Sequence, residues 1–176
     1  RSMGFNNINM DLIAGLPTDT WESFKDTVNK IIELDPESVT VHSLSMKRSA
    51  TLNTTGQLPE IEVGKIADKM VDFANTTLSN KGIVPYYMYR QSKTVGNLEN
   101  VGYAKKGYEC LYNVYIMDET HTILSCGASA VTKLREPFGN QIERIFNYKY
   151  PYEYINKFDE ILNRKIRIDE FYDLYK

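Results

Sequence analysis

The first part of the chain alternates in a way that leaves few folds open. Residues 8–13 read apolar and polar in turn, residues 21–34 carry apolar side chains at helical spacing, and residues 38–43 alternate again. A strand, a helix and a second strand at this spacing predict a βαβ unit, with parallel strands and a right-handed crossover. The predicted fold class is therefore α/β.

Turn and capping residues set the limits of the first helix. Asp19 or Thr20 is the candidate N-cap, because either side chain can accept a hydrogen bond from a free backbone N–H group. Pro36 disfavours helix at Asp35, so the helix is expected to end there. The apolar stripe of this helix consists of Trp21, Phe24, Val28, Ile31 and Ile32.

Each predicted strand has one apolar face and one polar face. Asn7, Asn9 and Asp11 share a face of the first strand, and Thr40 and His42 share a face of the second. Strands of an open doubly wound sheet are apolar on both faces, so a barrel or half-barrel with a polar interior explains this pattern best. An unpaired buried carboxylate costs several kcal/mol or more. Asp11 therefore indicates either a ligand contact or a structural hydrogen bond, for example to Asn9.

The rest of the chain predicts helices and strands in mixed order. The expected elements are a polar loop over 47–59, a helix over 61–81 with Gly82 at its C′ position, a strand over 83–91, a loop over 92–109, a β-hairpin over 111–127, a strand over 141–147, a helix that starts at Pro151 and a short helix opened by Asp169.

Composition excludes several classes of protein. The chain has 21 Lys and Arg against 23 Asp and Glu, a net charge of −2, which argues against a general binder of nucleic acids or anionic membranes. No apolar run approaches the roughly 20 residues of a membrane span. Cys110 and Cys126 are far apart and have no C-x-x-C partner, so we interpret them as reduced core thiols of a cytoplasmic protein, with no metal site built from this chain alone.

An ordered series of motifs resembles a known family. The strand D-L-I-x-G-L-P at 11–17, the threonine at the start of the following helix, the L-x-P before "SVTVHSL" and the later "GASAVTK" resemble the oxygen-independent coproporphyrinogen III oxidases, which are radical S-adenosylmethionine (SAM) enzymes. "VTVHSLSMKR", "PYYMYRQ" and "GNLENVGYAKKG" resemble a branch called coproporphyrinogen dehydrogenase. The resemblance runs from about Asn6 to Asn147.

The resemblance implies a fold and two cofactors. Residues 1–60 would form the last strand–helix units of a partial TIM-like barrel, and residues 61–176 an α+β C-terminal domain. In this family three cysteines spaced C-x-x-x-C-x-x-C hold a 4Fe–4S cluster, which binds SAM and cleaves it to a radical. This chain lacks that motif, so it is expected to be the C-terminal portion of a longer protein and to be inactive alone.

The implied activity is oxygen-independent oxidative decarboxylation of coproporphyrinogen III to protoporphyrinogen IX in heme biosynthesis. A tetrapyrrole would be the substrate, and an electron-donor protein a partner. Relatives of the family act as heme chaperones, so stoichiometric heme binding is the alternative function. His42 and His121 are the only histidines that could ligate heme iron. A non-enzymatic α/β interaction domain is a third interpretation, which the polar strand faces disfavour.

The resemblance also assigns candidate site residues. The SAM contacts would be Asp11, Ser45, Tyr112, Asn113 and Val131. Substrate contacts are His42, Tyr89, Arg90 and Gln91, with Arg90 chosen because arginine binds carboxylates bidentately and the substrate carries several. For the SAM set other than Asp11, simple packing is an equal alternative, and for Arg90 the alternative is solvation at the surface.

Overall fold

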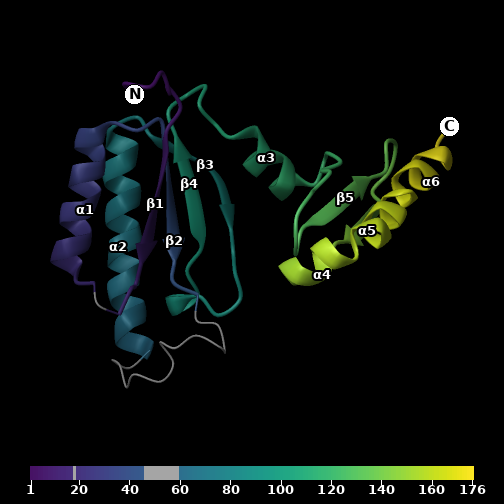
Figure 1. The fold of residues 1–176 in the computed structure, drawn as a ribbon. Coiled ribbons are helices and arrows are strands. Elements are labelled where there is room, and N and C mark those ends of the chain that lie inside the picture. Colours follow the sequence, from purple (N-terminus) through teal and green to yellow (C-terminus); the bar gives the residue numbers. More distant parts are fainter. Residues whose placement is uncertain (18, 46–59) are drawn as a thin grey trace. The chain divides into compact units, whose positions relative to one another are not determined.

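The computed structural model describes residues 1–17, 19–45 and 60–176, with the backbone alone at Glu60 and Ile61 (Figure 1). The described chain divides into two compact units, Arg1–Met117 and Asp118–Lys176. The domain division predicted between residues 60 and 61 stays a prediction. In the structure, the helix and two strands that follow residue 60 belong to the first compact unit. The polar loop predicted over 47–59 lies outside the described residues.

The βαβ prediction is confirmed. Strand β1 (Asn9–Ala14), helix α1 (Trp21–Leu34) and strand β2 (Ser38–Ser43) follow one another, and β1 and β2 are parallel. Their register places Asp11 opposite Thr40. The apolar residues of β1, Met10, Leu12 and Ala14, therefore share one face of the sheet with Val39 and Val41 of β2.

Helix α1 has the caps that its sequence predicts. Thr20 is the N-cap: its side chain accepts a hydrogen bond from the Ser23 backbone N–H, and the Ser23 hydroxyl accepts one from the Thr20 N–H. At the other end, Asp35 adopts a left-handed conformation with φ of 50° and donates its N–H to the carbonyls of Ile31 and Ile32. These caps satisfy backbone groups at both ends of the helix.

Strands β3 (Val84–Tyr89) and β4 (Asn100–Ala104) complete a four-stranded sheet in the order β1-β2-β4-β3. Strand β4 lies between β2 and β3 and is antiparallel to both. The prediction of a loop over 92–109 is therefore wrong, because this segment contains a central strand after a short turn, η2 (Val95–Asn97). Central strands exchange hydrogen bonds on both sides, and this pairing offsets the weak strand propensity of Gly102.

Helices α1 and α2 (Glu60–Asn80) cover one face of this sheet (Figure 1). Helix α2 agrees with the predicted helix over 61–81, and Gly82, with φ of 75°, follows it as expected. The main hydrophobic core lies between these helices and the sheet, and its buried members are Leu12, Ala14, Phe24, Val28, Ile31, Val39, Val41, Met70, Ala74, Leu78, Ile83 and Tyr103.

The opposite face of the sheet is the one that carries Asp11 and Thr40, and we call it the open face. Within the described part of the chain, the helices that build the core all pack on the other side. The described strands form an open mixed sheet. The α/β class is therefore confirmed, and closure into a partial barrel stays a prediction.

The second unit is a β-hairpin with helices packed on it. Strands β5 (Val131–Arg135) and β6 (Ile142–Phe146) are antiparallel, and helices α4 (Pro151–Asn156), α5 (Phe158–Lys165) and α6 (Arg167–Asp173) follow. Leu134 and Ile145 of the hairpin pack with Phe171 of α6 in a small core. The strand predicted over 141–147 and the helix start at Pro151 are confirmed, whereas the short last helix begins two residues before Asp169.

Two further predictions are wrong. Residues 111–118 form helix α3 (Leu111–Asp118) instead of the first arm of a hairpin. This segment is apolar without a helical stripe, so its pattern does not distinguish a short helix from a strand. Cys110 and Cys126 were interpreted as core thiols, but both are exposed. Neither cysteine belongs to either of the two hydrophobic cores.

Candidate functional site

Side chains from β1, β2 and β3 meet on the open face, and β4 contributes a glycine between them. The strand register aligns Asp11 with Thr40, Thr40 with Gly102, and Gly102 with Tyr87, so these positions form a row across the sheet. Tyr89 pairs with Asn100 one step further along, beside His42. The polar faces predicted for the first two strands are therefore parts of one surface that also includes β4 and β3.

A β-bulge decides which tyrosines reach this face. The register between β3 and β4 shifts between Pro85 and Tyr87, so Tyr86 is an extra residue in the strand. A bulge of this kind re-aims the side chains that follow it. Tyr87 and Tyr89 consequently share the open face, while Met88 lies on the helix side with Val101.

The Asp11 carboxylate has a neighbour at each oxygen. The Asn9 side-chain amide donates a hydrogen bond of 2.7 Å to Oδ1, and His42 Nε2 lies 3.7 Å from Oδ2. The Tyr89 hydroxyl lies 3.3 Å from His42 Nδ1. The Asp11 side chain is nevertheless 59% exposed, so its carboxylate can accept further hydrogen bonds from a ligand.

Tyr87 forms a second link across the sheet. Its ring lies over Gly102, because a Cβ atom added at that position would overlap the ring. Its phenol shares a hydrogen bond with the Thr40 hydroxyl, which lies 3.4 Å from Asn9 Oδ1. We call the six linked side chains, Asn9, Asp11, Thr40, His42, Tyr87 and Tyr89, the open-face network.

Burial and charge keep both phenols of the network neutral. Desolvation raises the pKa of Tyr87, and the neighbouring Asp11 carboxylate and the tyrosines on either side raise it further despite the Thr40 hydrogen bond. Desolvation and Asp11 likewise raise the pKa of Tyr89. Both residues are therefore hydrogen-bond donors throughout the physiological pH range.

Other predicted site residues lie at the end of the sheet. The Ser45 hydroxyl donates to the Ser92 carbonyl at 3.0 Å, and Ser45 pairs with Thr94 just beyond β2. Arg90 follows β3 and forms an ion pair of 3.0 Å with Glu99, and Gln91 is exposed beside it. The structure therefore places Arg90 close to Tyr89 but engaged with a carboxylate of the chain itself.

The three remaining candidates are not in the open-face network. Tyr112 lies on α3 and is 56% exposed, and Asn113 donates a hydrogen bond of 2.9 Å to the Tyr86 hydroxyl. That bond ties α3 to the bulge of β3. Val131 begins β5 in the second unit, opposite Phe146. Their assignment to a SAM site stays a prediction.

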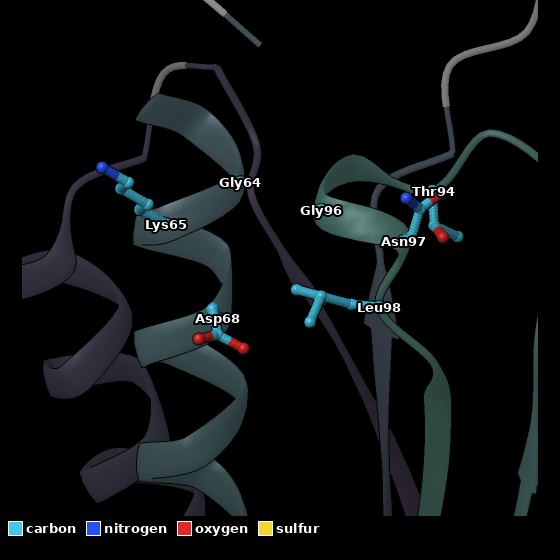
Figure 2. A pocket seen from close by; sticks show the side chains of 7 residues that line it. All are labelled: Gly64, Lys65, Asp68, Thr94, Gly96, Asn97 and Leu98. Atoms are coloured by element: carbon cyan, nitrogen blue, oxygen red, sulfur yellow. The ribbon is translucent and has the colours of Figure 1, made fainter. Parts of the chain in front are cut away.

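A hollow of about 460 Å³ lies near the carboxyl ends of β1 and β2 (Figure 2). Gly64 of α2 and Gly96 of η2 approach closely here, since a Cβ on Gly64 would lie 3.3 Å from Gly96 Cα. Leu98 points from the strand side toward α2, and Lys65 and Asp68 of α2 also line the hollow. The hollow adjoins the Ser45–Thr94 pair and is separate from the open-face network.

Among residues 1–17, 19–45 and 60–176, no group of three or more His, Cys, Asp and Glu side chains is arranged to hold a metal ion. In the same part of the chain, no helix is both long and apolar enough to cross a membrane.

Sequence reasoning missed Tyr87 and Gly102. Gly102 was placed in a loop, whereas Tyr87 lies in the strand predicted over 83–91, which the structure confirms, but the bulge at Tyr86 was not foreseen. The signal that could have identified them is a glycine within "NVGYA", because a glycine flanked by strand-forming residues often marks close approach of another group.

Fold and site together define an α/β protein with a polar, hydrogen-bonded network on the face of a mixed sheet opposite its core helices. The chain is 38% identical to the oxygen-independent coproporphyrinogen-III oxidase-like protein HemZ of Bacillus subtilis (strain 168) over 167 residues, which are 95% of this chain and 33% of that protein. The chain is homologous to proteins named as oxygen-independent coproporphyrinogen III oxidases, and it corresponds to the C-terminal region of that family.

Two further relatives carry different names. The heme chaperone HemW of Haemophilus influenzae is 26% identical over 86% of this chain and 36% of its own length. The anaerobic coproporphyrinogen III oxidase 1 of Cereibacter sphaeroides is 24% identical over 78% of this chain and 30% of its own length. The chain thus spans about a third of the length of these curated relatives. No family model matches the chain. No solved structure matches it either.

Proposed function

We propose that this chain is part of a radical SAM enzyme of heme biosynthesis that decarboxylates coproporphyrinogen III to protoporphyrinogen IX without oxygen. Homology to proteins named coproporphyrinogen III oxidases supports the substrate and the reaction. The single structural observation that supports a ligand site is the Asp11 carboxylate, which is held by Asn9, lies beside His42 and is open to solvent. The open face would line the interior of a barrel in the whole protein.

Asp11 suits the SAM molecule. A carboxylate accepts strong hydrogen bonds from amine and hydroxyl groups, and SAM carries both. Asn9 orients the carboxylate from one side, which leaves lone pairs on both oxygens for the ligand. When bound and reduced by one electron from the cluster, SAM would supply a radical that abstracts hydrogen from the substrate. In this proposal Asp11 binds and orients SAM, and Ser45, near the carboxyl end of β2, contributes a second polar contact.

The iron–sulfur cluster does not fit this chain. Cluster binding in the family needs three closely spaced cysteines, whereas Cys110 and Cys126 are the only two cysteines of the sequence and are far apart in it. The cluster ligands would have to come from a preceding part of the whole protein. The proposal therefore assigns to this chain only the binding of SAM and substrate and the exclusion of water.

Arg90, Tyr89 and His42 are the proposed substrate residues. A tetrapyrrole with propionate side chains needs cationic partners, and Arg90 lies next to Tyr89, which contacts His42. Arg90 would have to exchange Glu99 for a propionate. Because that ion pair is exposed, breaking it costs little, about 0–1 kcal/mol.

The test is an anaerobic assay of the whole protein with coproporphyrinogen III, SAM and a reductant. We expect formation of protoporphyrinogen IX together with SAM consumption. A protein that contains the cluster and binds SAM but forms no vinyl product would contradict the proposed reaction.

Heme binding is the second candidate function, because one relative is named as a heme chaperone. It predicts stoichiometric heme binding without decarboxylation. Titration of the whole protein with heme, followed by absorbance, separates the two functions when combined with the assay above.

A further inference from the structure

We infer that Tyr87, lying on Gly102, forms a floor on the open face that binds a pyrrole-type ring of a tetrapyrrole ligand. The inference rests on the proposed function only for the class of ligand, and it applies equally to an enzyme and to a chaperone. It adds a ring-binding position, Tyr87, and a specificity-determining position, Gly102, to the proposed contacts.

The Tyr87 ring has a fixed position on the sheet. Gly102 has no side chain, and the ring occupies the space that a Cβ atom would take. The Thr40 hydroxyl on β2 lies beside the phenol at the far end of the ring. A side chain that packing already holds in place loses little freedom when a ligand binds, which favours binding.

The two tyrosine rings of the open face lie parallel to each other. The rings of Tyr87 and Tyr89 are parallel to within 4°, and their centroids lie 6.2 Å apart. Both side chains extend from edge strand β3 across β4 to partners on β2, namely Thr40 and His42. Aromatic surfaces that are fixed in this way offer planar ligands a favourable stacking partner.

Charged and polar side chains surround this floor. Asp11 and His42 border the tyrosines on β1 and β2, and Arg90 lies just beyond Tyr89. Propionates can accept hydrogen bonds from a guanidinium. A tetrapyrrole, which has pyrrole rings and carboxylates, therefore complements both the tyrosine rings and Arg90, whereas a purely apolar ligand complements the rings alone.

The experiment measures equilibrium binding of coproporphyrin III, the planar fluorescent form of the proposed substrate, to the whole protein without SAM. Tyr87→Leu removes the ring, and Gly102→Ala displaces it. We expect each variant to bind about tenfold more weakly than wild type, while Tyr87→Phe, which keeps the ring, stays within about twofold. Met88→Ala, on the other face of the same strand, is the matched control and should bind as wild type does.

Thermal unfolding of every variant separates loss of the floor from loss of the fold. Wild-type affinity in both Tyr87→Leu and Gly102→Ala would overturn the inference, and so would an equal loss in Tyr87→Phe and Tyr87→Leu. Weakened SAM binding with unchanged porphyrin binding would also overturn it, because the ring would then serve the other ligand. The binding assay needs no turnover, so its result does not depend on whether the proposed decarboxylation takes place.

Discussion

The Asp11 carboxylate and the His42 imidazole lie side by side on neighbouring parallel strands, with Oδ2 and Nε2 3.7 Å apart. Tyr89 contacts the other nitrogen of His42, and Asn9 contacts the other oxygen of Asp11. The open-face network therefore joins the residue proposed to bind SAM to those proposed to bind substrate. A change at one of the two sites is expected to affect the other through His42.

Arg90 provides a prediction about substrate affinity. Arg90→Gln removes the proposed propionate contact, so we expect KM for coproporphyrinogen III to rise about tenfold with little change in kcat. Glu99→Gln frees Arg90 from its ion pair and should lower KM. Arg144→Gln, which breaks a comparable exposed pair with Glu119 in the second unit, is the control. Steady-state kinetics of the whole protein measure KM and kcat for each variant. If Arg90→Gln and Glu99→Gln leave KM as unchanged as the control does, Arg90 is not part of the substrate site.

Tyr103 predicts how stability depends on alkaline pH. Burial raises the pKa of Tyr103 to about 12, above its ordinary value of 10.0, and the nearby Asp72 contributes to this increase. The unfolded chain therefore loses this proton at a lower pH than the folded chain does. Its contribution to stability is complete below pH 10 and is lost as the pH rises toward 12, by about 2–3 kcal/mol in the free energy of unfolding.

The measurement for Tyr103 is urea unfolding of wild type and Tyr103→Phe at a series of pH values. The variant should lose part of the fall in stability above pH 10, because other tyrosines with raised pKa values, Tyr87, Tyr89 and Tyr175, contribute to the rest. Identical pH dependence in both proteins would show that the phenol of Tyr103 titrates as if it were exposed.

Substitution of Phe24 measures how much the main hydrophobic core contributes to the free energy of unfolding. The Phe24 side chain is 1% exposed within the cluster that joins α1 to β1 and β2. Phe24→Ala should lower the free energy of unfolding by about 3–5 kcal/mol, because the truncation removes apolar contacts and leaves a cavity. Phe5→Ala, at a position that is 70% exposed, should change it by less than about 0.5 kcal/mol. Denaturant unfolding measures both, and similar losses would contradict the described core.

The fold was predictable where the hydrophobic periodicity and the capping and turn residues indicate the same element. The βαβ unit, its caps and the long helix α2 follow from periodicity and from single residues such as Thr20, Pro36 and Gly82. Strand β4 was not predictable in this way, because Gly102 lowers its strand propensity and its stability comes from pairing with two distant strands. Helix α3 lacks any amphipathic period that could distinguish it from a strand.

The candidate site was predictable only in part. Alternation placed Asp11, Thr40 and His42 on one polar face, and the register confirms that these residues share it. The tyrosines could not be assigned to that face from the sequence, because one extra residue at the bulge exchanges the faces of all residues that follow. The role of Gly102 depends on a contact with another strand, which no local pattern contains.

The most direct test of the account is SAM binding by Asp11→Asn in the whole protein, measured by titration calorimetry. The substitution keeps the size and the Asn9 neighbour of the side chain but removes its charge, so we expect SAM to bind about ten- to a hundredfold more weakly. Asp26→Asn, which changes an equally exposed carboxylate on α1, should leave the affinity unchanged. Unchanged SAM affinity in Asp11→Asn would contradict the assignment of the open face as the SAM site.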